Sequence, residues 1–436
     1  MRRKALVAAV ATALAAGVAL VGGPTGATGS NPSDRAEQRL GVYLVHDVRG
    51  AAVERLAGTG VSVEEPAGDG VTVSGTDRQA DRLRERGYRV TTLSEPGRVE
   101  EVSRAAAAEE YPPGFEAYHT YDEMVAALDK IVADHPDIAQ KFSLGKSHEG
   151  RDIWGLKISD QVATDEAEPE ALFTCRLHAR EIITTEQCLA WADLLVGGYG
   201  SDDRITGLVD GREVVIIPEV NPDGAEFDIA SGDFAMWRKN RQPNAGSSYV
   251  GTDLNRNFGY KWGCCDGSST DPSAEDYRGE AAFSAPEARV IQDYTESRVK
   301  DGKQQITTHI DAHSYGDLVL YPYGYTDEDV PSDMTQDEHE TVVALGQAFA
   351  KENGYTAEQS SELYITDGAI DDNSFGHLYG DGDRHWGVAA FTFEIGDDFY
   401  PPASEIEALT GKNSEPFLIA LDYADCPSRI IGKPCS

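Results

Sequence analysis

The stretch Ala171-Leu172-Phe173-Thr174-Cys175-Arg176-Leu177-His178-Ala179-Arg180-Glu181 joins an apolar segment directly to a histidine and a glutamate three residues apart. The apolar part predicts a buried strand. A histidine and a glutamate at this spacing can both reach one metal ion where the backbone turns at the end of a strand. The HExxH pattern of many zinc peptidases is absent, and no second histidine follows closely. A third ligand therefore has to come from far along the chain.

Candidates for that third ligand are few, because the chain has ten histidines. His309 and His313 belong to an alternating segment, Ile306 to His313, which predicts a strand ending just before Ser314-Tyr315-Gly316. Strand alternation puts His309, Asp311 and His313 on one face. His313 is the better ligand candidate, because sites in open α/β sheets gather at strand ends. The alternative is that His313 is an ordinary buried histidine held by hydrogen bonds.

The sequence from residue 111 onward mixes predicted helices and strands. Residues 120–133 carry Met124, Leu128 and Ile131 at helical spacing, with polar residues between them. The predicted strands are residues 153–158, 171–173, 213–218, 305–311 and 389–394. A mixture of this kind over residues 111–436 predicts one large α/β domain.

Residues 1–30 have the layout of a secretory signal peptide. A short basic head, Met1-Arg2-Arg3-Lys4, precedes an apolar run that ends in small residues. The alternative is a transmembrane anchor, since the run is nearly long enough to cross a bilayer. Its Ala and Gly content and its small-residue end favour the signal peptide. We therefore expect a secreted, extracellular protein without a membrane anchor.

Residues 31–110 are predicted to be a propeptide. Within them, residues 41–93 alternate short strand-like and helical segments and indicate a small α/β unit. Residues 94–110 combine Pro, Gly, charge and an alanine run, which is typical of an exposed linker. Arg98 and Arg104 offer bonds there for a trypsin-like protease. An ordinary linker between two permanent domains is the alternative interpretation.

The formal net charge of the chain is −37. Nucleic acids and anionic membranes bind clustered Lys and Arg, so this charge argues against both as partners. For an extracellular protein, solubility is a sufficient explanation. Attraction of basic peptides is a weaker one.

The six cysteines are an even number, as expected for disulfides in an oxidising compartment. Cys175 with Cys188, and Cys426 with Cys435, are close enough in sequence to close short loops. Cys264 and Cys265 are adjacent and either form a bridge together or pair elsewhere. None of the six has the paired CxxC spacing of a structural zinc site.

A series of short motifs occurs in a fixed order, and together they resemble the zinc carboxypeptidases of the pancreatic A and B type, including secreted bacterial members. The similarity extends over about residues 112–425. Each motif is weak alone, but the ordered set is specific. The motifs are His178-Ala179-Arg180-Glu181, Trp237-Arg238-Lys239, Asp253-Leu254-Asn255-Arg256-Asn257, His313-Ser314-Tyr315, Tyr321-Pro322-Tyr323-Gly324, Tyr364 and Phe391-Thr392-Phe393-Glu394.

The resemblance implies a fold and a metal. The fold is a single α/β/α domain with a mixed, largely buried eight-stranded sheet, preceded by a small α/β prodomain. The metal is one catalytic Zn²⁺ held by His178, Glu181 and His313. Two imidazoles and a carboxylate leave a coordination position open for water, as in catalytic rather than structural zinc sites.

The resemblance also implies roles for the other motif residues. Glu394 matches the general base, Arg238 the cation that stabilises the oxyanion, and Asp253 the partner that orients His178. The residues that match substrate-binding positions are Asn255 and Arg256, which grip the terminal carboxylate, Tyr364, which closes over it, and Arg180, a secondary contact.

Specificity rests on one loop. Asp371 matches the pocket-floor position at which B-type enzymes carry Asp, which favours release of C-terminal Lys or Arg. Some bacterial relatives carry the acidic residue two positions earlier, where this chain has Ala369, and Asn373 stands where the family usually has Trp. A solvated pair of Asp371 and Asp372, with mixed basic and apolar specificity, is the alternative. The resemblance also implies a Cys175–Cys188 disulfide.

The sequence therefore predicts a secreted, zinc-dependent exopeptidase, active as a monomer on peptide and protein C-termini and inhibited by its own propeptide. Two alternatives remain: a non-catalytic binding protein of the same fold, and a zinc hydrolase acting on cell-wall peptides or acyl-amino acids. Retention of every expected chemical position argues against the first. Retention of Asn255, Arg256 and Tyr364 argues against the second. A serine hydrolase has little support, because no GxSxG motif is present.

Overall fold

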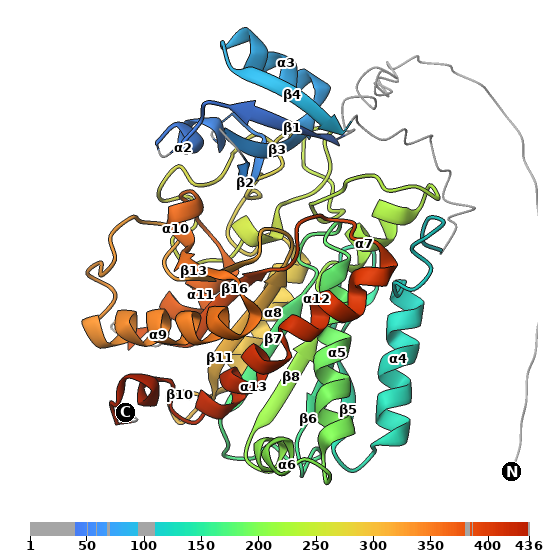
Figure 1. Ribbon diagram of the computed structural model, residues 1–436, viewed down its shortest axis with the longest axis vertical. Helices are drawn as coiled ribbons and strands as arrows, with labels where there is room; N and C mark the ends of the chain where they lie inside the picture. Colours follow the sequence, from blue (N-terminus) through green and yellow to red (C-terminus); the bar gives the residue numbers. More distant parts are fainter. Residues whose placement is uncertain are drawn as a thin grey trace, which may run out of the picture.

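The computed structural model describes residues 40–49, 51–57, 59–67, 70–94, 110–379, 384–385 and 387–434. The predicted signal peptide lies outside these residues, as does most of the predicted linker, including Arg98 and Arg104. A small N-terminal sheet sits at one end of a much larger domain (Figure 1). Within the described ranges, no helix combines the length and apolar character needed to span a bilayer.

The large domain is built on one eight-stranded sheet, with the strand order β13-β12-β16-β11-β7-β8-β6-β5. Strands β8, β7, β11 and β16 run parallel to one another, whereas β6 and β12 pair antiparallel with their inner neighbours. The predicted mixed sheet is therefore confirmed. The strands are β5 Ala139–Lys146, β6 Asp152–Ile158, β7 Glu170–Cys175, β8 Glu213–Ile217, β11 Ile306–His313, β12 Leu318–Tyr321, β13 Thr356–Gln359 and β16 Ala389–Glu394.

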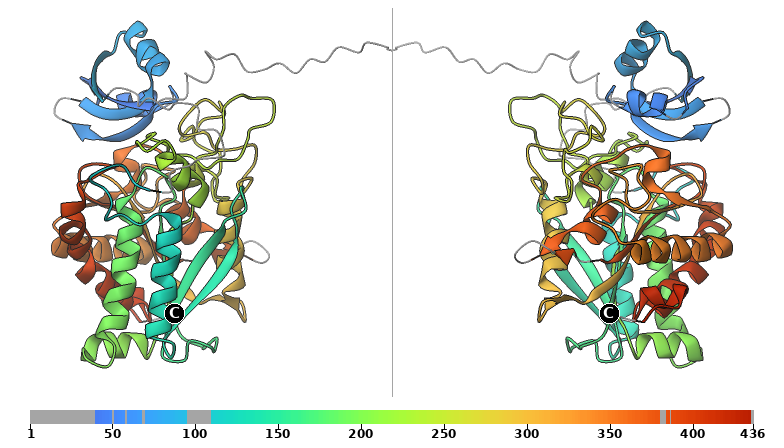
Figure 2. Two further views of the ribbon diagram at one scale, coloured as in Figure 1. Left: turned by 90° about the vertical axis from the view of Figure 1, so that its right-hand side faces the viewer. Right: turned by 90° about the vertical axis from the view of Figure 1, so that its left-hand side faces the viewer.

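Side chains alternate between two apolar cores on the two faces of this sheet. Phe173 and Ile216 belong to one core, and their neighbours Leu172 and Val215 belong to the other. Both faces are covered by helices, so the strands are apolar on both sides, and the domain has three layers (Figure 2). On the first face lie α4 Tyr121–Asp134, α5 Ile183–Gly198, α9 Gln336–Asn353, α12 Ile406–Lys412 and α13 Ser414–Tyr423; on the second lie α8 Pro286–Ser297 and α11 Ile370–Gly376.

Aromatic packing holds the centre of the first face. Trp191 of α5 and Phe417 of α13 stack with ring centroids 5.2 Å apart, and both rings contact Phe173 of β7. The predicted helix over 120–133 is α4, which starts one residue later because Thr120 is its N-cap and forms a capping box with Glu123.

Short elements connect the layers or lie at the edges. The helical ones are α6 Asp203–Val209, α7 Pro222–Ile229, α10 Ser360–Leu363, η1 Leu254–Arg256, η2 Ala403–Glu405 and η3 Pro427–Ile431. The extended ones are β9 Val299–Lys300, β10 Lys303–Gln304, β14 Leu378–Tyr379 and β15 Arg384–His385.

The N-terminal region is a four-stranded antiparallel sheet with the order β2-β3-β1-β4. Five of its six segments follow the predicted pattern, but the prediction missed β2. That strand contains Pro66, lies at the sheet edge and has a register shift after Val63. A proline is tolerated at such an edge but weakens the sequence signal of a strand. The elements are β1 Leu40–His46, α2 Ala51–Ala57, β2 Ser62–Ala67, β3 Gly70–Thr76, α3 Asp77–Glu85 and β4 Arg89–Ser94.

Two disulfides are described. Cys175 at the end of β7 is joined to Cys188 of α5, which is the pairing that the resemblance implied. Cys264 and Cys265 are joined to each other, one of the two alternatives left open. Cys426 is also in a disulfide, and Cys435 lies outside the described residues.

Candidate metal centre and active site

The two predicted metal-ligand segments meet at one edge of the sheet. Strand β7 ends at Cys175, and Arg176 then takes a left-handed backbone conformation, φ 55°, that turns the chain out of the sheet. His178 and Glu181 lie on the loop that follows, just before α5. His313 is the last residue of the adjacent parallel strand β11. Because parallel strands end at the same edge, segments more than 130 residues apart come together there.

Buried hydrogen bonds hold the loop that carries His178 and Glu181. The Arg176 guanidinium donates to the Ala179 carbonyl at 3.0 Å and to the Tyr111 hydroxyl at 2.7 Å. The Ala179 amide donates to the Arg238 carbonyl at 3.1 Å. The loop is therefore fixed from both sides before any ligand binds.

The predicted ligand atoms converge on one buried point. His178 Nδ1 lies 2.7 Å from Glu181 Oε1, His313 Nδ1 lies 2.9 Å from Glu181 Oε2, and the two Nδ1 atoms are 3.0 Å apart. Tetrahedral zinc with ligands at about 2.0–2.1 Å separates them by about 3.3 Å, so the arrangement fits zinc. Two imidazoles and one carboxylate are also the donor types that zinc prefers, and they leave a fourth position open.

Asp253 links this cluster to Arg238. Its Oδ1 lies 3.1 Å from His178 Nε2, and its Oδ2 accepts from Arg238 Nε and Nη2 at 3.1 and 3.0 Å. Complete burial opposes ionisation of Asp253, but Arg238 and His178 outweigh it and hold the pKa of this carboxyl well below its usual range. A permanently ionised Asp253 orients one imidazole and one guanidinium at once.

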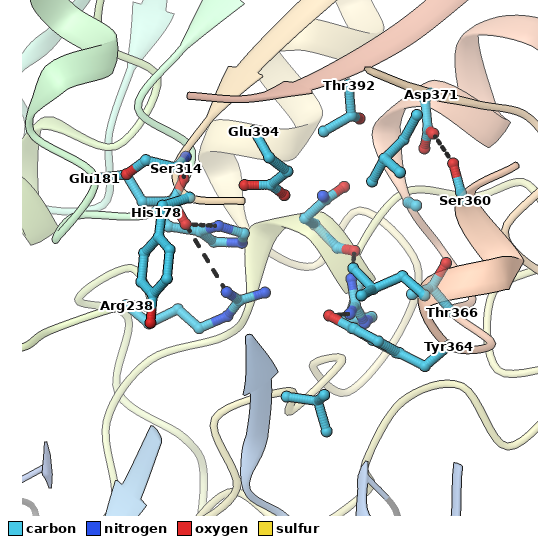
Figure 3. A pocket seen from close by; sticks show the side chains of 17 residues that line it. His178, Glu181, Arg238, Ser314, Ser360, Tyr364, Thr366, Asp371, Thr392 and Glu394 are labelled. Carbon is cyan, nitrogen blue, oxygen red and sulfur yellow. Dashed lines mark hydrogen bonds and ion pairs between the residues drawn. The ribbon is translucent and has the colours of Figure 1, made fainter. Parts of the chain in front are cut away.

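A second group of polar side chains lies on the other side of the same cavity. Asn255 and Arg256 belong to the short η1 segment, and Tyr364 follows α10. Arg256 Nη2 donates to the Tyr364 hydroxyl at 3.3 Å, and Asn255 Oδ1 accepts from the Ile370 amide at 2.9 Å. Figure 3 shows Tyr364 across the cavity from His178 and Arg238, with Glu394 between the two groups.

One cavity therefore contains most of the predicted site. The predicted residues that line it are His178, Glu181, Arg238, Asn255, Arg256, Tyr364, Asp371 and Glu394. His313 adjoins it through its contact with Glu181, and it pairs in register with Glu394 of β16. Arg180 does not line the cavity: it is buried, with its guanidinium over the Phe399 ring at 4.2 Å.

Asp371 and Asp372 occupy different environments. Asp371 faces the cavity and accepts from the Ser360 hydroxyl at 3.0 Å, and burial raises the pKa of its carboxyl (Figure 3). Asp372 instead accepts from the backbone amides of Gly324 and Tyr325 at 2.8 and 3.1 Å. Both side chains are buried within α11, so the alternative of a solvated pair in a loop is wrong.

Comparison with known proteins decides the family. Residues 124–415 match the family model described as zinc carboxypeptidase. A zinc carboxypeptidase of Saccharothrix mutabilis subsp. capreolus is 42% identical over 98% of both chains, and bovine carboxypeptidase A1 is 32% identical over 67% of this chain and 66% of its own. The chain belongs to the zinc carboxypeptidase family.

As a member of this family, the chain is a peptidase, and zinc is the metal that the family implies for the triad described above. The crystal structure of carboxypeptidase A from Helicoverpa armigera has a similar fold, with a TM-score of 0.70 and 23% identity over 89% of this chain and 98% of that chain. That share is larger than residues 111–436 alone could supply, so the similarity of fold extends into the N-terminal region.

The prediction missed Val63, which comes from the N-terminal region and lines the zinc carboxypeptidase cavity. The Gly60 carbonyl in the same region accepts from the Glu275 amide at 3.4 Å, and Tyr364 packs against the N-terminal apolar core. No motif marks Val63, because it lies on the edge strand β2 that the sequence pattern did not reveal.

Replacing Glu181 tests the metal centre. Glu181→Gln should weaken zinc binding by at least about 100-fold, since a neutral amide replaces a ligand and the loss of outer partners already costs about 10–100-fold. Competition with a chromophoric chelator measures the affinity. Glu186→Gln, on α5 and paired with His119, is the matched control and should stay within a few-fold of wild type. Wild-type zinc affinity in Glu181→Gln would contradict the assignment.

Proposed function

We propose that this chain is a secreted, zinc-dependent exopeptidase that hydrolyses the C-terminal peptide bond and releases single amino acids. One observation carries the proposal: a single cavity combines a zinc-type triad with Glu394 and with the Asn255, Arg256 and Tyr364 group. The first part supports hydrolysis, and the second supports recognition of a free carboxylate. A monomer acting on peptide and protein C-termini is sufficient for this reaction, because every proposed group comes from one chain.

In this proposal His178, Glu181 and His313 hold one zinc ion. Bound there, zinc supplies Lewis-acid polarisation of the scissile carbonyl and makes a bound water acidic. Glu394, in register with His313 at the ends of neighbouring strands, accepts the proton of the attacking water and passes it to the leaving amine.

Arg238 stabilises the negative charge that develops on the carbonyl oxygen. Asp253 holds its guanidinium through Nε and Nη2, with Nη1 4.0 Å from Glu181 Oε1. The cation is therefore fixed beside the metal triad before substrate arrives. Loss of one such donor costs about 2.7–4 kcal/mol in other hydrolases.

Arg256 and Asn255 bind the terminal carboxylate. The Arg256 guanidinium is almost completely buried, and a planar guanidinium can donate to both carboxylate oxygens. Asn255 Oδ1 already accepts from Ile370, and the NH₂ group, which lies 3.5 Å from His313 Nε2, has a second N–H that can donate to the substrate. The Tyr364 hydroxyl, now on Arg256, gives way to the carboxylate and closes over the bound residue. The predicted secondary contact, Arg180, is not part of this clamp, because its guanidinium is buried over Phe399 and does not line the cavity.

Hydrolysis by the proposed machinery is testable with a blocked peptide. Wild type should release the last residue, chelation should abolish release, and added zinc should restore it. Glu394→Gln should keep zinc but lower kcat by about 10²–10⁴-fold, because the general base is lost. Glu407→Gln, an exposed change on α12, is the control. An amidated C-terminus should not be cleaved; unchanged cleavage of the amide would indicate an endopeptidase instead.

We further propose that Asp371 selects C-terminal Lys or Arg. Its carboxylate is buried at the cavity wall, and in the described part of the chain the groups that donate hydrogen bonds to it are neutral, the Ser360 hydroxyl and the Asp372 amide. A buried carboxylate without a hydrogen-bonded cation attracts a basic side chain that enters the cavity. Apolar residues enter the same cavity beside Leu320 and Ala369 and are weaker substrates.

The specificity assignment predicts a selective loss. Asp371→Asn should lower kcat/KM for peptides ending in Lys by about 30-fold, corresponding to about 2 kcal/mol for a lost buried charge pair. Peptides ending in Leu should be hydrolysed at nearly the wild-type rate. Asp372→Asn, whose carboxylate binds backbone amides, should leave the Lys-to-Leu ratio unchanged. An unchanged ratio in Asp371→Asn would refute the assignment.

We also propose that residues 1–30 direct secretion and that residues 31–110 keep the enzyme latent. Support comes from Val63, which reaches the cavity, and from the contact of Tyr364 with the N-terminal core. A region that occupies the mouth of the cavity and packs on the proposed lid hinders the entry of a peptide terminus. Cleavage within residues 95–110 then separates this region from the catalytic domain, residues 111–436.

Latency predicts an increase in activity on cleavage. Limited trypsin treatment of the full chain should raise the rate of peptide hydrolysis, and a chain with both Arg98→Gln and Arg104→Gln should respond much less. Activity followed together with the cleavage pattern checks this. Equal activity of the cleaved and intact chains would show that the N-terminal region does not inhibit.

A further inference from the structure

The second histidine of the triad has a buried carboxylate partner of its own. His313 Nε2 lies 2.5 Å from Asp311 Oδ2, two residues earlier on β11. Asp311 is 1% exposed and does not line the substrate cavity. Asp311 is thus the carboxylate partner of His313 in the same way that Asp253 is the partner of His178.

A chain of hydrogen bonds fixes Asp311 from behind. The Thr174 hydroxyl donates to Asp311 Oδ1 at 2.5 Å, and the same hydroxyl lies 2.9 Å from His309 Nε2. His309 Nδ1 in turn lies 2.8 Å from the Ser374 hydroxyl of α11. All of these side chains are buried, so this series of hydrogen bonds runs through the protein interior from α11 to the metal triad.

Counting donors and acceptors gives this series of hydrogen bonds one consistent direction. An ionised Asp311 can only accept, so the single Thr174 proton goes to it, and Thr174 must accept from His309 Nε2–H. His309 Nδ1 then accepts from Ser374. Burial lowers the pKa of His309 to about 4, which agrees with the neutral ring that this pattern needs. At the other end, His313 must carry its proton on Nε2 and present the Nδ1 lone pair to Glu181 and the metal position.

Asp311 also differs from Asp253 in its charge environment. Arg238 neutralises Asp253 through two hydrogen bonds, whereas in the described part of the chain the side chains hydrogen-bonded to Asp311 are a threonine and a histidine. The hydrogen bond from His313 Nε2 to the Asp311 carboxylate makes Nδ1 of the same ring a stronger ligand for a cation.

We propose that Asp311, held by Thr174, is a positioning residue of the metal centre that fixes the tautomer and orientation of His313 and tightens zinc binding. The inference rests on the proposed function, because it requires zinc at the triad. It does not require any particular substrate or any effect of the N-terminal region.

Zinc affinity of the full chain tests the inference, by competition with a chromophoric chelator. Asp311→Asn should bind zinc about 10–100-fold more weakly than wild type, the range for loss of an outer partner of a metal ligand. Asp228→Asn is the matched control: Asp228 is equally buried and hydrogen-bonded to Tyr400 and the Trp237 amide, but does not touch the triad. It should bind zinc within a few-fold of wild type.

Further readouts separate positioning from a general structural role. The visible absorption spectrum of the Co²⁺-substituted chain should change in Asp311→Asn and not in Asp228→Asn, because only the first alters a ligand. Thr174→Val, which removes one hydroxyl at nearly constant volume, should weaken zinc binding in the same direction by a smaller factor. If Asp311→Asn does not fold, the zinc affinity of Thr174→Val decides whether the inference holds.

The outcomes are distinguishable. The inference is overturned if Asp311→Asn keeps the zinc affinity of wild type, or if Asp311→Asn and Asp228→Asn lose equal amounts of affinity. Where Asp311→Asn does not fold, an unchanged zinc affinity in Thr174→Val overturns it. A wild-type chain that binds no zinc would instead overturn the proposed function itself.

Discussion

The convergence of His178, Glu181 and His313 is the constraint on which the rest of the site depends. The two imidazole Nδ1 atoms lie 3.0 Å apart, and each lies within 2.9 Å of one oxygen of the Glu181 carboxylate, with all three side chains buried. Such an arrangement is unfavourable without a cation between the atoms, because buried donors and charges need partners. The neighbouring structure opposes relaxation: β7 and β11 run parallel and end together, and Arg176 ties the loop to its own backbone and to Tyr111.

The same carboxylate, Asp253, connects metal binding to charge stabilisation. One of its oxygens faces His178 and the other binds the Arg238 guanidinium, so neither partner can move without disturbing the other. Burial makes this coupling strong, since removal of any one partner leaves an uncompensated charge in the interior. The proposed oxyanion cation thus takes its position from the metal centre. The two groups that must act on one carbonyl oxygen are placed by a single side chain.

Much of this could be predicted from the sequence, because the central strands are apolar on both faces and the ligands follow directly after them. Strand alternation alone placed Asp311 on the same face as His313. The features that the sequence did not predict depend on contacts between distant segments or have only a weak local signal. The pairing of Asp311 with Thr174 depends on strand order, which the pattern of one strand does not contain. Val63 went unnoticed because its edge strand includes Pro66, and the position of Arg180 over Phe399 could not be deduced from the motif that contains it.

The proposed carboxylate clamp and the proposed side-chain pocket are joined by one peptide unit. Asn255 Oδ1 accepts from the amide of Ile370, and Asp371 is the next residue on α11. Arg256 at the same time donates to Tyr364, on the segment that leads into α11. The distance between the groups that would hold the terminal carboxylate and the group that would hold the terminal side chain is therefore set by rigid backbone rather than by flexible side chains. A substrate residue has both groups on one Cα, so under the proposed function this geometry would admit the last residue of a chain in one orientation. That orientation would direct its peptide bond toward Glu394 and the metal triad, which lie together at the ends of β16, β11 and β7.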